Sequence, residues 1–211
     1  QEVVITDPGT RQLIREESRS IEVVSDEFLS LNQSGSLMTS LERLPGVSSM
    51  RIGSGQAKPV IRGMSFDRVV ITENGIRHEG QQWGADHGLE IDQYAAERIE
   101  VIKGPASLQY GFDAIAGLIR IKQNKTPPQN SLGGSLNLVG ASNQGLLGSS
   151  LQLYGRKGKF FVTTRLSVTD YADYQVPGDT VQIYTWKVPL KNGRVRNTAG
   201  EESNLHFSAG Y

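Results

Sequence analysis

The chain has 211 residues, of which 37% are hydrophobic and 7% aromatic, and its 22 Lys plus Arg balance 22 Asp plus Glu. This balance leaves no overall field that would favour nucleic acid or an anionic surface as a partner. There is no cysteine, which excludes a disulfide framework and thiolate metal sites. No apolar run approaches the ~18 residues of a membrane-spanning helix. Gln1 does not open a signal peptide either, so we expect that the signal peptide of an exported protein would be missing from this chain.

The N-terminus is a short β-branched run followed by a breaker, Asp7-Pro8-Gly9. An extended peptide of this kind can add as a strand to the exposed sheet edge of a partner, with main-chain hydrogen bonds supplying the affinity. The alternative is an ordinary first strand of the domain. The run consists of Glu2, Val3, Val4, Ile5 and Thr6.

The next segments predict a strand and two helices. Ser20–Ser25 alternates as a strand does, and Ser25-Asp26-Glu27 is a helix start with acidic residues in its first turn. In 36–44, Leu37, Leu41 and Leu44 share one face, Ser36 can serve as N-cap, and Pro45-Gly46 stops the helix.

The stretch from Pro59 to Lys122 organises the chain. Strands are predicted at Arg68–Thr72, Arg98–Lys103 and Gly117–Lys122, and Asn74-Gly75 after the first is a strong hairpin signal. Several short motifs occur in order just before and within this stretch: Pro-Gly-Val (45–47), Ile-Arg-Gly (61–63), Asp-Arg-Val (67–69), Asn-Gly (74–75), Glu-Arg-Ile-Glu-Val (97–101) and Gly-Pro-Ala-Ser-Leu-x-Tyr-Gly (104–111).

This ordered set resembles the plug domain of TonB-dependent outer-membrane receptors. The resemblance implies an α+β plug, with a small mixed sheet, short helices and long loops. It implies that Glu2–Thr6 is a TonB box, the segment that receives the energy transducer. It also implies that Arg62 and Lys103 latch the plug to carboxylates of the barrel wall, although an arginine at 103 would be the stronger bidentate partner. Without the resemblance, both cations could simply be solvated.

The polar excursion Ile76–Asp92 is the most distinctive segment, and loops of this length inside compact domains are usually functional. The resemblance places it towards the arriving ligand. His78, Asp86 and His87 could contact a metal or a metal chelate, and Gln81, Gln82 and Trp83 could bind an organic ligand. Alternatively, Trp83 and His87 pack to hold the loop.

Lys122–Asn130 has the composition of a linker and contains Pro127-Pro128, and the sequence pattern changes after it. Beyond it, apolar residues alternate with polar or small ones, which is what a membrane barrel strand requires. We therefore expect four antiparallel strands of a truncated transmembrane β-barrel, with 156–159 periplasmic and 170–200 an external loop. The four segments are Gly134–Ala141, Leu147–Gly155, Phe160–Thr169 and Ser203–Tyr211. The expected domains are a TonB-box-like segment 1–10, a plug 11–125, a linker 126–132 and the barrel strands 133–211.

The predicted function is uptake of a scarce extracellular nutrient across the outer membrane of a Gram-negative bacterium, using TonB-transduced energy. The nutrient class is a metal chelate, siderophore, haem, corrinoid or similar compound. The expected partners are the TonB C-terminal domain, with the N-terminus in the periplasm, the ligand, and outer-membrane lipid in the full-length protein. Because four strands cannot close a barrel, we also expect the fragment to self-associate through exposed strands.

The alternative is a passive ligand-binding or adhesion protein on the same fold. We expect no enzyme and no cofactor, since the chain has no Gly-x-Ser-x-Gly elbow, no His-Glu-x-x-His motif and no cysteine nucleophile. Gly53 and Gly55 alone do not make a phosphate-binding loop.

Overall fold

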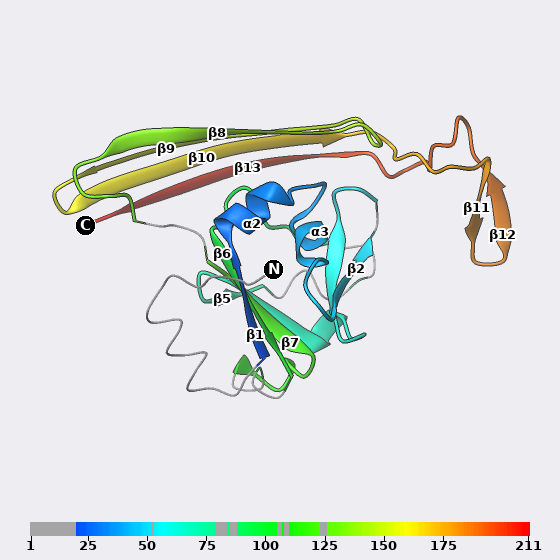
Figure 1. Cartoon of the computed structure of the whole chain (residues 1–211), viewed down its shortest axis with the longest axis horizontal. Helices are drawn as coiled ribbons and strands as arrows, with labels where there is room; N and C mark the ends of the chain where they lie inside the picture. Colours follow the sequence, from blue (N-terminus) through cyan, green and yellow to red (C-terminus); the bar gives the residue numbers. More distant parts are fainter. Residues whose placement is uncertain are drawn as a thin grey trace. The chain divides into compact units, whose positions relative to one another are not determined.

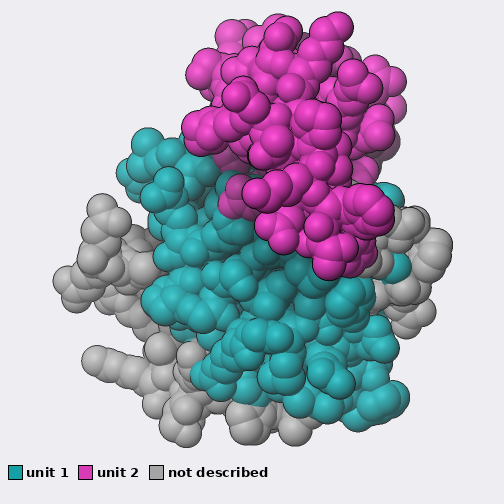
Figure 2. All heavy atoms as spheres, turned by 90° about the vertical axis from the view of Figure 1, so that its right-hand side faces the viewer, with its two compact units in different colours: residues 1–33, 37–50, 58–125 teal, residues 34–36, 51–57, 126–211 magenta. Residues whose placement is uncertain are grey.

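The computed structural model describes residues 20–51, 53–78, 84, 88–104, 107, 110–122 and 126–211. The chain divides into two compact units, which Figure 2 shows in different colours. Unit 1 comprises residues 1–33, 37–50 and 58–125, and unit 2 comprises residues 34–36, 51–57 and 126–211. No helix in the part of the chain that the structure describes is both long and apolar enough to cross a membrane.

Unit 1 is built on a five-stranded mixed sheet with the strand order β1-β6-β7-β4-β5 (Figure 1). β4 and β7 pair in parallel, and the other neighbours pair antiparallel. The predicted strands at 20–25, 98–103 and 117–122 are confirmed. The strand predicted at 68–72 begins one residue later than predicted, because Arg68 belongs to a 3-10 turn, η1 (Phe66–Arg68). The strands are β1 (Ser20–Ser25), β4 (Val69–Glu73), β5 (Ile76–Arg77), β6 (Arg98–Lys103) and β7 (Gly117–Lys122).

Two short helices follow β1. Ser25 caps α2 (Asp26–Leu31), since its hydroxyl accepts a hydrogen bond from the Phe28 amide at 3.3 Å. The second helix, α3 (Leu37–Leu41), is shorter than predicted because the chain turns from Leu41 onward. A two-stranded sheet, β2 (Val47–Arg51) with β3 (Ala57–Ile61), was not predicted.

Both sides of the unit-1 sheet carry buried apolar residues. β-branched side chains from β4, β6 and β7 are fully buried on one side: Val69, Ile71, Ile99, Val101, Ile119 and Ile121. On the other side, Val70, Ile102, Leu118 and Ala114 form a second cluster, against which Ile21 packs. A sheet covered on both sides has no need of polar alternation, which explains why these strands are almost continuously hydrophobic.

Unit 2 is dominated by a four-stranded antiparallel sheet in the order β13-β10-β9-β8 (Figure 1). The structure confirms the four predicted strands, and each is longer than predicted. β9 and β10 meet in a two-residue turn in which Gly158 has φ 60°, as a type II′ hairpin requires at its first central position. The strands are β8 (Leu132–Ala141), β9 (Leu146–Lys157), β10 (Phe160–Tyr171) and β13 (Gly200–Gly210).

The long connection between β10 and β13 contains a hairpin that the sequence reasoning missed. It consists of β11 (Thr180–Ile183) and β12 (Trp186–Pro189), and it projects beyond the ends of the long strands (Figure 1). The signal was present as alternation in Thr180–Ile183. The turn residues between the strands, Tyr184-Thr185, are not hairpin-forming types.

Candidate functional site

The chain enters the polar excursion through a tight hairpin. Asn74 and Gly75 have φ values of 50° and 86°, so the turn is of type I′. His78 lies at the point where the excursion leaves the sheet, and its Nε2 is 2.7 Å from Glu73 Oε2. A carboxylate on Nε2 favours the tautomer that carries the proton there, which leaves the lone pair of the neutral ring on Nδ1.

A group of charges lies at the end of β6 and β7, on the side of the sheet that holds the Val70–Leu118 cluster. The Glu100 carboxylate is nearly buried and forms ion pairs with Arg98 at 3.1 Å, Arg120 at 2.9 Å and Lys122 at 3.3 Å. Arg120 also donates to the Tyr110 hydroxyl and lies 4.9 Å from the centre of that ring. This network joins two strands and the segment before β7, so its role within the described residues is to hold those elements together.

The two predicted latch residues differ in their surroundings. Lys103 is buried, with its Nζ 2.7 Å from Glu22 Oε1, and it also donates to the carbonyl oxygen of Pro45. Arg62 is exposed and has φ 50° in the tight turn that links Ile61 to Met64. A non-glycine residue in this region costs about 1 kcal/mol and often marks a functional position.

The structure brings the neighbourhoods of Arg62 and Lys103 together. Arg62 Nη1 lies 2.9 Å from the point where a Cβ on Gly104 would be, so the glycine leaves room for the guanidinium. Gly104 directly follows Lys103. The latch itself, which needs barrel carboxylates, stays a prediction.

The remaining predicted site residues lie outside the described residues. They are Glu2, Val3, Val4, Ile5 and Thr6 in the TonB-box-like segment and Gln81, Gln82, Trp83, Asp86 and His87 in the excursion. Of the candidate metal ligands, only His78 is described. The described residues contain no group of three or more His, Cys, Asp or Glu that could hold a metal ion.

The four-stranded sheet of unit 2 has one strongly apolar side. Its register aligns Leu136, Leu151, Leu166 and Leu205 in a row across all four strands. Further exposed apolar side chains on this side extend the row towards both ends of the strands: Leu132, Leu138, Leu147, Leu153, Phe160, Val162, Val168, Phe207 and Tyr211. At one end the Phe160 and Tyr211 rings lie 6.1 Å apart, and at the other the side chains of Asp170 and Glu201 are polar.

The opposite side of the same sheet is polar and less exposed. Arg165 donates to Gln152 Oε1 at 2.8 Å, and the register places His206 next to Arg165. Ser150, Thr163, Ser167 and Thr169 are buried on this side. One apolar and one polar side are what a strand between lipid and a barrel lumen needs.

The connection between β10 and β13 is held at its base by Asp173. The Asp173 carboxylate accepts hydrogen bonds from the Thr198 amide at 2.8 Å, the Ala199 amide at 3.0 Å and the Thr198 hydroxyl at 3.3 Å. These donors, the Thr198 amide first, hold the pKa of Asp173 below its usual value, with a smaller contribution from Arg194.

Beyond this clamp, the β11–β12 hairpin is amphipathic. Pairing of Val181 with Val188 and of Ile183 with Trp186 places these four on one side, while Thr180, Gln182, Lys187 and Pro189 share the other. Trp186 and the turn residue Tyr184 are 75% and 92% exposed, so large rings stand in solvent at the tip.

The comparisons with known proteins agree with this architecture. Residues 14–118 match the model of the TonB-dependent Receptor Plug Domain family. The chain is 34% identical over 188 residues to the iron-regulated outer membrane virulence protein of Vibrio cholerae, covering 85% of this chain and 27% of that protein. It is 34% identical over 143 residues to the vitamin B12 transporter BtuB of Vibrio vulnificus, covering 67% of this chain and 23% of that protein.

Solved structures show the same fold. The FrpB iron transporter from Neisseria meningitidis superposes with a TM-score of 0.67 at 18% identity, over 88% of this chain and 28% of that one. The copper transporter OprC gives a TM-score of 0.61 at 24% identity, over 75% and 25%. The chain thus spans about a quarter of the length of these proteins.

The chain belongs to the TonB-dependent outer-membrane receptors, with a plug region that matches over residues 14–118 and with β8, β9, β10 and β13 as antiparallel strands of the transmembrane barrel. This is a family of receptors rather than of enzymes. The spacing between the two boundaries of the apolar side on β10, the aromatic Phe160 and the charged Asp170, fits a transmembrane barrel. From Phe160 to Asp170, β10 rises about 34 Å. A tilt of about 40° makes this about 26 Å across the membrane, close to the ~25 Å apolar band of such barrels.

Proposed function

We propose that the protein is an energy-coupled receptor that binds a scarce extracellular nutrient and imports it with energy from TonB. The observation that carries the proposal is the plug match over residues 14–118, together with a five-stranded sheet whose strands and turns follow the ordered motifs. A plug can take part in uptake only if ligand binding outside the cell changes its periplasmic end. The segment that would contact TonB, Glu2–Thr6, is therefore part of the proposal.

The proposed cargo is a metal chelate or a corrinoid-like compound. The Vibrio relatives support this class, since one is named for iron regulation and another for vitamin B12 transport. In this chain, His78 at the start of the excursion is held by Glu73. The excursion's polar residues Gln81, Gln82, Trp83, Asp86 and His87 are the proposed ligand contacts. Direct ligation of a metal by His78, Asp86 and His87 is the narrower form of the same proposal.

The proposed coupling segment is Glu2–Thr6, which would add as a strand to the sheet edge of the TonB C-terminal domain. Proline at position 4 removes a main-chain donor from that ladder. We expect a peptide of the first ten residues to bind the domain and its Val4→Pro form to bind at least tenfold more weakly. Val4→Thr, which stays β-branched and keeps the N–H, is the matched control.

Equal binding by the Val4→Pro and Val4→Thr peptides would remove strand addition as the mechanism. A second experiment uses the full-length receptor in cells. Deleting Glu2–Thr6 should abolish growth on the scarce nutrient while ligand still binds at the cell surface. Normal uptake after this deletion would favour the passive binding or adhesion function instead.

Arg62 and Lys103 are proposed to latch the plug to the barrel, and their surroundings suggest unequal roles. Lys103 already has Glu22 as a partner within unit 1, whereas Arg62 is exposed in a strained turn. We expect Arg62→Gln to loosen the plug in the full-length receptor, seen as a higher passive permeability to small solutes. An unchanged permeability in that variant would argue against Arg62 as a latch.

A further inference from the structure

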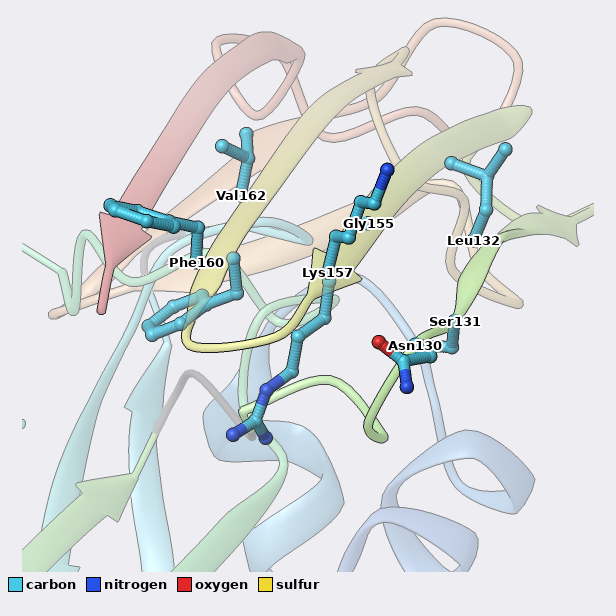
Figure 3. A pocket seen from close by; sticks show the side chains of 9 residues that line it. Asn130, Ser131, Leu132, Gly155, Lys157, Phe160 and Val162 are labelled. Carbon is cyan, nitrogen blue, oxygen red and sulfur yellow. The ribbon is translucent and has the colours of Figure 1, made fainter.

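The lipid-facing side of the barrel sheet has a hollow beside the β9–β10 turn. A groove of about 690 Å³ opens there. Leu132, Gly155, Lys157, Phe160 and Val162 line it from this side of the sheet, and Asn130, Ser131, Arg156 and Phe161 complete its lining. In Figure 3 the side chains of Leu132, Lys157 and Val162 rise from the same side of the sheet around Gly155. Every element of the groove belongs to unit 2, so its shape does not depend on the plug.

The groove exists because Gly155 interrupts the row of apolar side chains. The register places Gly155 of β9 between Leu132 of β8 and Val162 of β10, and these two neighbours are 91% and 47% exposed. Gly155 has an ordinary strand conformation, and a Cβ there would meet nothing nearer than Leu132 Cδ1 at 3.4 Å. The glycine is therefore not demanded by the backbone. Because β9 is an interior strand, further barrel strands added beyond β8 or β13 would leave the floor of the groove open.

The groove lies at the membrane interface on the periplasmic side. Membrane barrels have short periplasmic turns and longer external loops, and β9–β10 is joined by two residues whereas β10 is followed by the long connection. Phe160 and Tyr211 form an aromatic pair at the same level, as expected of the interfacial girdle. A ligand in the groove would have its apolar part in the membrane and its polar part at this turn.

The charges around the turn are all positive. Between Thr126 and Thr169 the sequence holds Arg156, Lys157, Lys159 and Arg165 and no carboxylate. Arg156 is used internally, since its guanidinium donates to the Pro127 carbonyl oxygen at 3.0 Å. Lys157 and Lys159 are exposed and make no ion pair with any residue that the structure describes. Lysines here can extend to the interface from apolar surroundings and offer their ammonium groups to an anion.

We propose that this groove binds one anionic glycerophospholipid of the periplasmic leaflet. One acyl chain lies over Gly155 between Leu132 and Val162, and the headgroup phosphate meets Lys157 and Lys159. The occupant is a lipid rather than free phosphate because the lysines adjoin an apolar groove that a phosphate alone would leave empty. The lipid would fix the β9–β10 turn at the interface. The proposal is independent of the cargo and of energy coupling.

The test uses the full-length receptor, purified in detergent and incubated with equal amounts of phosphatidylglycerol and phosphatidylcholine of identical chains. Native mass spectrometry then gives the ratio of the two lipids retained. A basic side chain near a membrane surface contributes about a fivefold preference for an anionic lipid. We therefore expect Lys157→Gln/Lys159→Gln to lower the ratio about 25-fold, and Lys187→Gln/Lys191→Gln, in the β10–β13 connection, to leave it unchanged.

A second pair of variants tests the groove itself. Gly155→Leu fills the hollow, and we expect a several-fold loss of retained phosphatidylglycerol. Gly140→Leu is the matched control. Gly140 is an exposed glycine of β8 that lies on the same side of the sheet as Gly155 but at the other end of the strands, and a Cβ there would meet only Leu146 O at 3.8 Å. Thermal unfolding of each variant confirms that it is folded, and the lysine variants test the site even if Gly155→Leu does not fold.

Three results would overturn the proposal. One is an unchanged lipid ratio in the Lys157→Gln/Lys159→Gln receptor. Another is equal retention in the Gly155→Leu and Gly140→Leu receptors, because the groove would then play no part. The third is displacement of phosphatidylglycerol by equimolar inorganic phosphate, which would make the lysines a simple anion site.

Discussion

Ile119 of the plug and Leu166 of the barrel sheet are both large aliphatic residues at the middle of a central strand. Ile119 is fully buried, in a sheet covered on both sides, whereas Leu166 is 53% exposed in the middle of an apolar row. The difference teaches that β-strand hydrophobicity alone does not tell the inside of a protein from the outside of a barrel. The medium on the open side decides, and for β10 that medium is lipid.

Charges divide in the same way between the two regions. In the plug, Glu100 and Lys103 are nearly buried, and both are paired with charges on neighbouring strands. In the barrel sheet, charges on the apolar side are confined to the strand ends, such as Lys157 and Asp170. A charged side chain can be buried inside a protein when an opposite charge pairs with it, whereas a lipid-facing charge is tolerated only near the membrane interface.

The largest effect expected from this comparison is on the plug core. Ile119→Ala should lower the free energy of unfolding by about 2–5 kcal/mol, because it leaves a cavity among fully buried side chains. Leu166→Ala should cost less than about 1 kcal/mol, because lipid chains are as apolar as leucine and refill the space. Denaturant unfolding of the receptor in lipid vesicles measures both. Equal losses would mean that the open side of β10 is packed against protein.

The next effect concerns two adjacent residues on opposite sides of β8. Leu136→Arg places a charge in the middle of the apolar band and should destabilise the barrel by about 2–4 kcal/mol. Asn137→Arg, one residue along and on the polar side, should stay within about 1 kcal/mol of the wild type. The same vesicle-refolding equilibrium compares them. A larger loss for the asparagine variant would reverse the assignment of the two sides.

A smaller effect of the opposite sign is expected at the β11–β12 turn. Tyr184 has φ 55° in the turn position that prefers glycine. Tyr184→Gly should stabilise the hairpin by about 1 kcal/mol through relief of this strain, and hydrogen exchange of the β11 and β12 amides should slow. Thr185→Gly, where φ is not positive, should instead speed exchange. Faster exchange in Tyr184→Gly would show that the exposed ring itself holds the hairpin.

The smallest effect is the pH dependence of the loop clamp. Because the folded pKa of Asp173 is lowered, its contribution is present above the unfolded pKa of about 3.9 and is lost as the pH falls through the folded pKa. Exchange at the Thr198 and Ala199 amides, corrected for intrinsic rates, should therefore rise below about pH 4. Asp173→Asn keeps an acceptor oxygen without the charge and should remove this acid-dependent rise. A rise that persists in Asp173→Asn would assign the titration to another group.

Sequence reasoning was sufficient where local chemistry and spacing act over a few residues. Asn74-Gly75 specified a type I′ turn because both positions need positive φ, and Ser25 capped a helix through its own hydroxyl. The alternation in Phe160–Thr169 predicted a strand with one apolar side, and the ordered motifs identified the family. It missed the β11–β12 hairpin because Tyr184 occupies a turn position normally taken by glycine.

By itself, then, the amino-acid sequence determined where most strands lie along the chain, the hairpin turn at Asn74-Gly75 and the change from plug-like to membrane-strand patterning, since these follow from short-range periodicity and backbone preferences. Only the tertiary structure decided which distant residues meet: Lys103 with Glu22, His78 with Glu73, Arg62 beside Gly104, and Gly155 between Leu132 and Val162. These contacts depend on strand order and register. Strand order and register are set by how whole sheets pack, and no short segment carries that information.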